Sequence, residues 1–329
     1  MIINSKICFI KITKMIFLVS SLFILFSCKD KVIFKKKEVV LIKAPISFYP
    51  NRTFPLELSE DKSLIQFKWK NNELYFVDKN QILFKKYFDK YQDAFVESKD
   101  SIFLINKETG KILLINSKFD TLSSWQIPKW INNSKYNMFI NQCSNFIKYQ
   151  DKLYLTIFPA GYLDTFYTKQ TEIIYDLKTQ RVEKLYMRFP KIYSKNSWWG
   201  STGNRVSKIL NNKNELIFHY PMFNNILILK NNSIEEIKLA KSKYLKSFPP
   251  QPQIYPPPDN KYVFEYTIQT PLYYSLLYDK FHDLYFRIVA HKQSLYKNSL
   301  KNTIISRVWS IMIFDNNFKF LEEIKMEGG

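Results

Sequence analysis

Glycine, histidine and cysteine are scarce in this sequence of 329 residues, which has 6 glycines, 3 histidines and 3 cysteines. It contains no Gly-rich phosphate loop, no nucleophile-elbow motif and no helical His-Glu-x-x-His motif. The spacing of the histidines gives no reason for them to converge on a metal; they are His219, His282 and His291. The sequence therefore predicts no metal site and no cofactor, and it leaves any catalytic residue unknown.

The cysteines exclude a disulfide framework. Cys8 and Cys28 both lie in the N-terminal segment, which leaves Cys143 alone in the body of the chain. An unpaired cysteine in such a body is most simply a small buried apolar residue.

Arginine is scarce although the formal net charge is +20, with 49 Lys and Arg against 29 Asp and Glu. The arginines are Arg52, Arg181, Arg188, Arg205, Arg287 and Arg307. Proteins that read nucleic acids depend on arginine for bidentate contacts with bases and phosphates. The excess of lysine therefore indicates a solvated surface, and we predict no nucleic-acid partner.

No apolar run is long enough to span a bilayer, which needs roughly 20 residues. The longest, 16–27, follows three lysines of the N-terminal segment and ends at Leu25-Phe26-Ser27-Cys28. A positive segment, a short apolar segment, a small residue and a cysteine are typical of a bacterial lipoprotein signal. Phe26 departs from the usual residue there, and a simple secretory signal or an uncleaved anchor is the alternative. Translation could start at Met1 or at Met15.

These features predict three regions: a signal peptide over 1–27, a charged tether over 28–37 and a single domain over 38–329. Cys28 would carry the acyl chains, palmitate included, that anchor the protein to a membrane. We expect a monomer in the cell envelope, on the outer membrane; the sequence does not decide the leaflet.

The body of the chain consists of β-strand patterns without an amphipathic helix. The predicted strands are rich in β-branched and aromatic residues. They are 64–69, 74–77, 102–105, 112–115, 153–158, 173–177, 216–220, 226–229, 262–266, 284–289 and 309–314. The turns between them are short, and Asn and Asp are expected to supply the left-handed conformations that glycine usually provides.

Several strands, such as 102–105 and 112–115, are apolar at successive positions, so both of their faces must be covered. The connections are too short for crossover helices. Radially packed blades of a β-propeller meet this requirement. A weak repeat of roughly 45–60 residues recurs along the chain and gives about six blades. The predicted fold is therefore all-β, a six-bladed β-propeller with a terminal blade that is complete or unfinished.

Two stretches interrupt the strand pattern. The first, 194–204, holds adjacent Trp198 and Trp199 close to Arg205. Neighbouring residues in an extended segment point in opposite directions, so one tryptophan can pack while the other faces solvent. We take these three residues as a candidate site for a sugar or a peptide. The second, 247–259, is rich in proline and is expected to connect two blades or to dock a partner.

The segment 278–287 reads YDKFHDLYFR. Its Tyr278, Asp279, Asp283, Tyr285 and Arg287 resemble the signature Tyr-Asp-x-x-Arg-Asp-x-Tyr-Tyr-Arg of an uncharacterised family of Bacteroidetes lipoproteins. That family is a domain of unknown function with a six-bladed propeller. The resemblance implies the fold and the location, and it carries no activity.

The segment 278–287 also has a structural explanation. If Asp279 and Asp283 flank a turn, Arg287 could bond to either of them across the hairpin. Ligand binding by these residues is the alternative.

Three functions remain open from the sequence. The first is a lipoprotein whose propeller binds an unknown protein or glycan without catalysis. The second is a carbohydrate-active hydrolase or lyase, because the paired carboxylates of a glycosidase need no local motif. The third is a structural subunit of an envelope complex. Propellers serve all three functions, so the fold alone does not decide whether the protein is an enzyme.

Overall fold

A computed structural model describes the protein in part. It covers residues 24–28, 31–35, 57–58, 64–68, 73–78, 81–88, 90–91, 93–98, 100–128, 139–140, 146–158, 167–193, 199, 203–230, 233–245, 248, 266, 269–292 and 308–326. For the residues before 87, and for 139–140, 158 and 233–236, only the backbone is described.

The chain divides into two compact units. Unit 1 comprises Met1–Ile157 and Ile173–Lys184, and unit 2 comprises Phe158–Glu172 and Leu185–Gly329. Every element with described bounds is a β-strand, and all the strand pairings that are resolved there are antiparallel. Only Gly203, Tyr266 and Gln269 are helical among the described residues. The prediction of an all-β protein is confirmed.

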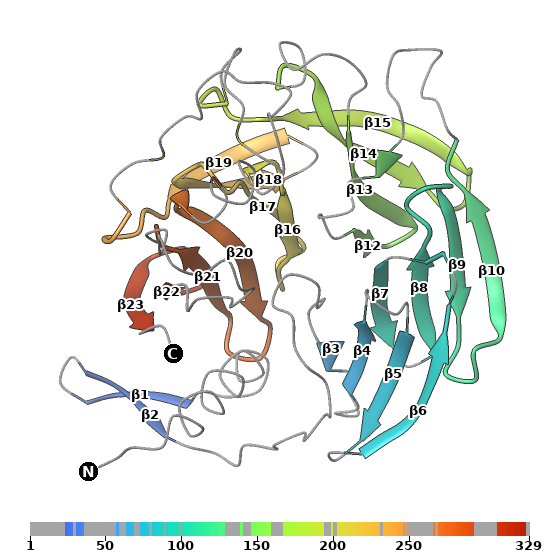
Figure 1. Ribbon diagram of the computed structural model, residues 1–329, viewed down its shortest axis with the longest axis horizontal. Helices are drawn as coiled ribbons and strands as arrows, with labels where there is room; N and C mark the ends of the chain where they lie inside the picture. Colours follow the sequence, from blue (N-terminus) through green and yellow to red (C-terminus); the bar gives the residue numbers. More distant parts are fainter. Residues whose placement is uncertain are drawn as a thin grey trace, which may run out of the picture. The chain divides into compact units, whose positions relative to one another are not determined.

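The four-stranded sheets are meanders in which strands that follow one another in the chain lie side by side (Figure 1). Unit 1 holds two four-stranded sheets. Their strands are β3 (Glu57–Leu58), β4 (Leu64–Lys68), β5 (Glu73–Asp78) and β6 (Gln81–Tyr87), and then β7 (Asp93–Ser98), β8 (Ser101–Ile105), β9 (Lys111–Ile115) and β10 (Thr121–Gln126).

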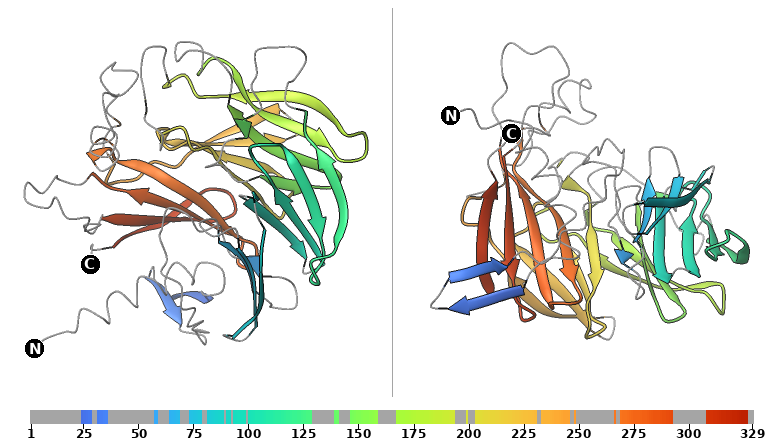
Figure 2. Two further views of the ribbon diagram at one scale, coloured as in Figure 1. Left: turned by 45° about the vertical axis from the view of Figure 1, so that its right-hand side comes forward. Right: turned by 90° about the horizontal axis from the view of Figure 1, so that it is seen from below.

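Unit 2 also holds two four-stranded meanders, which are seen from other directions in Figure 2. Their strands are β16 (Ser207–Leu210), β17 (Leu216–His219), β18 (Asn225–Lys230) and β19 (Ser233–Leu239), and then β20 (Leu272–Asp279), β21 (Leu284–Ala290), β22 (Trp309–Phe314) and β23 (Phe320–Met326).

A fifth sheet is made of strands from both parts of the division. It contains β11 (Phe139–Ile140), β12 (Ile147–Tyr149), β13 (Lys152–Phe158), β14 (Gln170–Asp176) and β15 (Arg181–Arg188). The described residues thus contain five sheets of four or five strands. These sheets have the strand order of propeller blades, but the predicted number of six is not confirmed.

Where side chains are described, strands in the middle of the sheets, such as β8, β14, β17 and β18, are largely buried on both faces, as their apolar sequences predicted. All four residues of β17 are buried, as are six of the seven in β14. In contrast, β10 and β15 alternate between exposed and partly buried residues over most of their length. The middle strands are covered on both faces, whereas the outer strand is exposed to solvent. The sequence therefore shows apolar runs followed by charged ones.

The prediction about the turns needs a correction. Asn214 and Asp283 do adopt a left-handed φ, at 60° and 56°. However, Phe119, Phe318 and Gln180 adopt the same conformation, with φ of 66°, 60° and 56°. Among the described residues, Asn and Asp are therefore not the main suppliers of this backbone geometry.

Asn and Asp act instead at the first position of these turns, which is the structural reason for their abundance there. The Oδ1 atom of Asn211 accepts hydrogen bonds from the amides of Lys213 and Glu215, at 3.0 and 2.8 Å. The equivalent oxygen of Asn116 accepts from two amides at 2.9 Å, and so does that of Asp315. A side chain that satisfies two amides holds the turn closed, whichever residue occupies its left-handed position.

All of the predicted strands except 262–266 coincide with observed ones; of that range, only Tyr266 is described, and it is not in a strand. No helix in the described part of the chain is long and apolar enough to cross a membrane.

The N-terminal region contains a hairpin, drawn in blue in Figure 2, of β1 (Ile24–Cys28) and β2 (Lys31–Lys35). It lies across the predicted processing site before Cys28, so cleavage there would remove most of β1. The predicted boundaries 1–27, 28–37 and 38–329 stay predictions.

Candidate functional site

The segment that carries the sequence signature is the β20–β21 hairpin of unit 2. Tyr278 and Asp279 end β20, Asp283 lies in the turn with φ of 56°, and Tyr285 and Arg287 lie in β21. The hairpin is packed against the sheet of β16–β19, so the geometry of these five residues is defined by two neighbouring sheets of the same unit.

Arg287 is completely buried and bonds to the backbone of the neighbouring sheet. Its guanidinium donates hydrogen bonds to the carbonyl oxygens of Asn224, at 2.7 Å, and of Ala240 and Phe223, each at 2.6 Å. The same group lies 3.4 Å from the centre of the Tyr273 ring, which is a close cation–π contact. Arg287 therefore fastens the β17–β18 turn and the end of β19 to β21.

These contacts correct the predicted partner of Arg287. Neither Asp279 nor Asp283 pairs with it: Asp279 accepts from the amides of Phe281 and His282, at 2.9 and 3.3 Å. Arg287 faces Leu276 and Met312 in the sheet register, and its side chain leaves the hairpin instead of crossing it. Burial lowers the pKa of Arg287 to about 9, so the guanidinium remains charged at neutral pH.

The tyrosines of the signature form a stack on the β16–β17 turn. Tyr285 lies between Tyr278 and Phe318, with ring centres 4.9 and 4.1 Å away. The hydroxyl of Tyr278 donates to Asp283 and accepts from the amide of Asn212. Burial, and then the hydrogen bond to Asp283, raise the pKa of the Tyr278 phenol.

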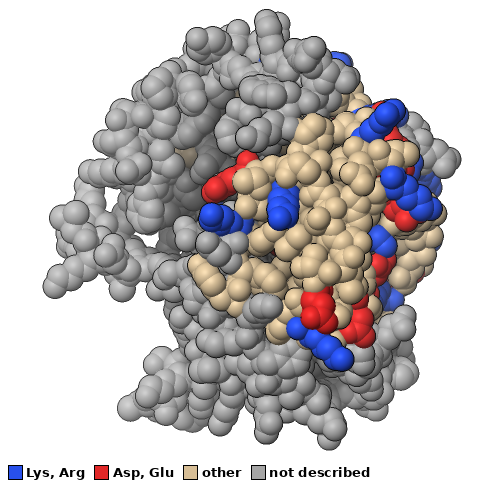
Figure 3. Space-filling model, turned by 90° about the vertical axis from the view of Figure 1, so that its right-hand side faces the viewer, with Lys and Arg blue, Asp and Glu red and all other residues tan. Residues whose placement is uncertain are grey.

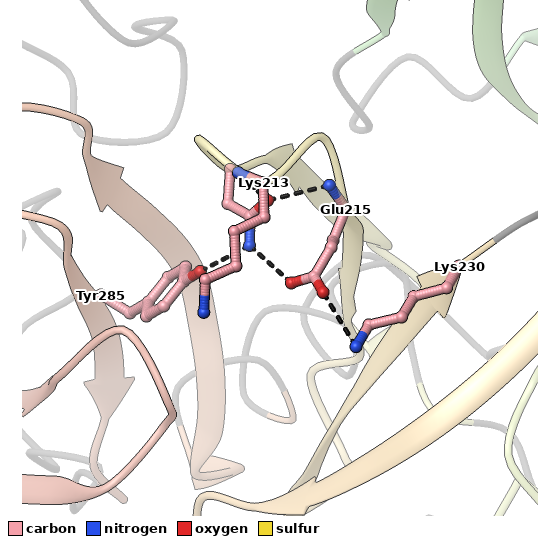
Figure 4. Close-up of polar contacts among 5 residues, drawn as sticks. Lys213, Glu215, Lys230 and Tyr285 are labelled. Carbon is pink, nitrogen blue, oxygen red and sulfur yellow. Dashed lines mark hydrogen bonds and ion pairs between the residues drawn. The ribbon is translucent and has the colours of Figure 1, made fainter.

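A polar network continues from this stack (Figure 4). The side-chain amide of Asn211 donates to the hydroxyl of Tyr285 at 3.0 Å and to the carboxylate of Glu215 at 2.8 Å. The same carboxylate also forms an ion pair with Lys230 at 2.9 Å. Burial alone would raise the pKa of Glu215, but the contacts with Asn211 and Lys230 hold it below its usual range. Glu215 is thus an ionised, paired carboxylate that holds the turn.

The tryptophan hypothesis is tested at one of its two residues. Trp199 is only 2% exposed and packs against Tyr193, with ring centres 5.4 Å apart. It therefore cannot stack on an external sugar, and Trp198 lies outside the described residues. Arg205 is partly buried, and its Nε atom has no hydrogen-bond partner among the described residues.

A buried ion pair joins the first strand of the β16–β19 sheet to β14. The Nζ atom of Lys208 lies 2.6 Å from Glu172, and both side chains are completely buried. Unit 1 contains a similar pair, Lys107 with Asp93, at 2.9 Å. Burial, and then the charge of Glu172, raise the pKa of the Tyr220 hydroxyl far above its usual value.

His219, in β17, is completely buried, and neither of its ring nitrogens has a hydrogen-bond partner among the described residues. Its ring lies edge-on to Tyr273, with centres 6.3 Å apart. Burial, and then the charge of Arg287, lower the pKa of His219 well below 6.5. The imidazole is therefore neutral in the folded protein.

This neutral histidine should make the protein less stable in mild acid. Below pH 6.5 the unfolded chain binds a proton at His219 that the folded chain does not, so stability falls as the pH falls. The expected loss is about 1.4 kcal/mol between pH 7.5 and pH 5.5. Thermal melts over this pH range give the slope of stability against pH. His219→Leu should lack the part of that slope that comes from His219, whereas His282→Gln, a change at an exposed histidine, should keep it. Parallel curves for the wild type and His219→Leu would contradict the assignment.

The surface of unit 2 contains a groove that the sequence did not reveal. It has a volume of about 440 Å³ and is lined by Lys241, Ser242, Lys243, Leu245 and Phe320. The lining comes from the loop after β19 and from the start of β23.

The floor of the groove is held by a buried carboxylate. Glu323 accepts hydrogen bonds from the hydroxyls of Ser242 and Ser310, each at 2.6 Å, and from the amide of Lys243 at 2.9 Å. The hydroxyl of Tyr273 accepts from the amide of Ser242 at 3.0 Å, which links the groove to the residue on which Arg287 stacks. This loop therefore has a defined backbone before any ligand arrives.

The family model described as "Domain of unknown function (DUF4221)" matches residues 18–325. The chain belongs to this family. The match covers nearly the whole chain, so the resemblance that was inferred from the segment 278–287 is confirmed.

A crystal structure of a member of the DUF4221 family from Bacteroides vulgatus ATCC 8482 superposes with a TM-score of 0.67. The two chains are 16% identical, and the alignment covers 84% of this chain and 82% of the other. A protein of unknown function from Bacteroides caccae aligns with a TM-score of 0.47 at 7% identity, over 83% of this chain and 81% of that one. No curated protein matches the chain in sequence. The similarity to the Bacteroides vulgatus structure supports the fold of this family member and assigns no activity to it.

The described residues hold no group of His, Cys, Asp and Glu that could bind a metal ion. The residues of the signature are occupied by contacts inside the protein, whereas the groove exposes side chains that could contact a ligand.

Proposed function

We propose that this chain is a lipid-anchored protein of the cell envelope whose propeller-type domain binds a ligand without catalysing a reaction. The observation that supports binding is the groove of unit 2, which combines exposed lysines with an exposed aromatic ring over a fixed backbone. Small-molecule sites usually have a preformed concave surface with a few placed polar groups.

The burial and hydrogen bonding of Glu323 favour a binding function over hydrolysis. A glycosidase needs two carboxyl groups that face the substrate, roughly 5–10 Å apart. Glu323 is 4% exposed and accepts three hydrogen bonds from the protein, so it acts as a structural acceptor. The lysines of the groove are suited to holding an anion in place.

The proposed location depends on the lipoprotein signal. Leu25, Ser27 and Cys28 stand where a lipoprotein signal requires them, directly after a short apolar segment. Acylated Cys28 would tether a monomer to the outer membrane through the lysine-rich segment 29–37.

The anchoring can be tested at Cys28. In the native host, Cys28→Ala should remain unprocessed or leave the lipid-anchored pool, because the acylated group is gone. Cell fractionation and labelling with an alkyne fatty acid measure both outcomes. Cys143→Ala is the matched control, since it removes the other cysteine of the mature chain and should stay labelled and anchored. An unlabelled wild type, with the fractionation of Cys28→Ala unchanged, would refute lipid anchoring.

A further inference from the structure

The groove on unit 2 is lined by exposed lysines, and the carboxylate that bonds to its loop, that of Glu323, is buried and bonded to neutral donors. Lys241 and Lys243 line it and are exposed, and Lys325 reaches the adjacent Tyr244. None of these three ammonium groups has a carboxylate partner within the described part of the chain.

On other parts of the described surface, some lysines lie beside acids. Figure 3 shows a face of the molecule on which Lys and Arg alternate with Asp and Glu. Ion pairs such as Lys178 with Asp151, at 2.7 Å, and Lys152 with Glu183, at 2.8 Å, are examples. What sets the groove apart is that Lys241 and Lys243 line one depression together with an exposed ring, Phe320.

Aromatic rings stand beside these lysines. Tyr244 is 43% exposed and Phe320 is 44% exposed, so both rings can reach a ligand. The Nζ atoms of Lys243 and Lys325 lie 4.9 and 5.7 Å from the centre of the Tyr244 ring. His291 packs edge-on against the same ring, with centres 5.9 Å apart, and so limits its movement.

The backbone of the lysine loop is fixed from below. Glu323 accepts from the amide of Lys243, the hydroxyl of Ser242 accepts from the amide of Tyr244 at 3.1 Å, and Leu245 is buried. Because the loop is already ordered, a ligand would not have to supply the free energy of ordering it.

We infer that this groove binds an acidic saccharide, that is, a sugar that carries carboxylate or sulfate groups. This inference rests on the proposed binding function and names its ligand class. The lysines would hold the acidic groups, and Tyr244 and Phe320 would contact the apolar face of a sugar ring.

Three features favour this occupant over other anions. The first is size: a groove of about 440 Å³ falls in the range of small-ligand sites, roughly 300–1,000 Å³. The second is shape: the groove is an open depression along which a short saccharide can lie, whereas a bilayer surface needs a protruding apolar group to reach it. The third is that exposed rings lie beside the lysines. A free inorganic anion would contact only the lysines, whereas an acidic sugar would contact the lysines and the rings.

The test is direct binding to the purified mature chain by calorimetry. The probes are tri-galacturonate, its fully methyl-esterified form, a sulfated trisaccharide and a neutral trisaccharide. We expect the two acidic sugars to bind, with an affinity that falls as salt is added. The ester and the neutral sugar should bind at least tenfold more weakly.

Two groove variants should lose the binding. Lys241→Glu/Lys243→Glu should raise the dissociation constant for tri-galacturonate at least tenfold, which corresponds to about 1.4 kcal/mol. Tyr244→Ala should weaken the binding of both acidic sugars. The matched control is Lys118→Glu/Lys280→Glu, which makes the same charge change at exposed lysines. Lys280 lies 5.4 Å above the exposed ring of Phe281, so it reproduces the lysine–aromatic pairing away from the groove.

Each result supports or overturns the inference. If the groove double variant still binds tri-galacturonate, or if the control double variant loses binding to the same extent, the inference is overturned. It is also overturned if an acidic peptide binds as tightly as the acidic sugars and binds the wild type and Tyr244→Ala equally, because charge alone would then explain the binding. If no acidic sugar binds, the ligand class is wrong, while acyl labelling at Cys28 would still support the proposed envelope function. If an acidic sugar binds and is then cleaved, the groove assignment stands and the proposal of a non-catalytic protein fails.

Discussion

Replacing Lys208 with methionine should destabilise unit 2 more than most single substitutions in this protein. Both side chains of the pair are completely buried, so the change leaves the Glu172 carboxylate in the interior without the ammonium group of Lys208. Removing one partner of a buried ion pair typically costs about 3–5 kcal/mol. For a domain of 150–250 residues, this lowers the melting temperature by roughly 6–20 °C. Differential scanning calorimetry at pH 7 measures the shift.

The double variant separates the pair from its surroundings. Replacing both partners of a buried pair by apolar residues is often neutral or stabilising, so Glu172→Met/Lys208→Met should melt well above Lys208→Met. Lys178→Met is the control, because its pair with Asp151 has side chains that are 75% and 52% exposed. Exposed pairs contribute about 0–1 kcal/mol, so that variant should melt close to the wild type. Equal melting of Lys208→Met and Lys178→Met would show that the buried pair does not stabilise the fold.

The strands could be read from the sequence because the middle of each sheet is apolar at successive positions. In β17, for example, four consecutive residues are buried, and the run 216–220 had predicted this strand. The polar outer strands alternate more weakly, and their register depends on the neighbour to which they pair. The number of sheets depends on the whole chain and could not be counted from a repeat so degenerate.

The role of Arg287 was predicted only in part, and the reason is physical. In a sequence, only acidic residues stand out as partners for an arginine. The actual acceptors are carbonyl oxygens of Phe223, Asn224 and Ala240. Every residue has such an oxygen, so only the fold reveals which of them converge on one guanidinium.

The groove was missed for a related reason. Lys241–Leu245 reads KSKYL, which does not differ from other lysine-containing loops of this chain. Its neighbour Phe320 is 75 residues or more away in the sequence and joins it only because Glu323 of β23 bonds to the loop. Trp199 shows the opposite case: a conspicuous residue in the sequence lies in the interior.

Replacing Arg287 with lysine should also cause a large loss of stability, since one ammonium cannot reach three carbonyls that a planar guanidinium reaches at 2.6–2.7 Å. We expect at least two of these hydrogen bonds to be lost. A hydrogen bond to a charged group contributes about 1.5–3 kcal/mol, so the total loss is about 3–6 kcal/mol. The melting temperature should then fall by roughly 6–24 °C without any ligand present.

The control for this prediction is Arg205→Lys, which makes the same change at a partly buried arginine for which no hydrogen bond to a carbonyl is found among the described residues. It should melt within a few degrees of the wild type. Arg287→Met adds a second comparison: it removes the charge and leaves the three carbonyls without their donor, so it should be at least as unstable as Arg287→Lys. If Arg287→Lys melts like the wild type, the three carbonyl contacts do not stabilise the fold. Arg287 would then have to be considered as a ligand-binding residue, in agreement with the alternative interpretation of the segment 278–287.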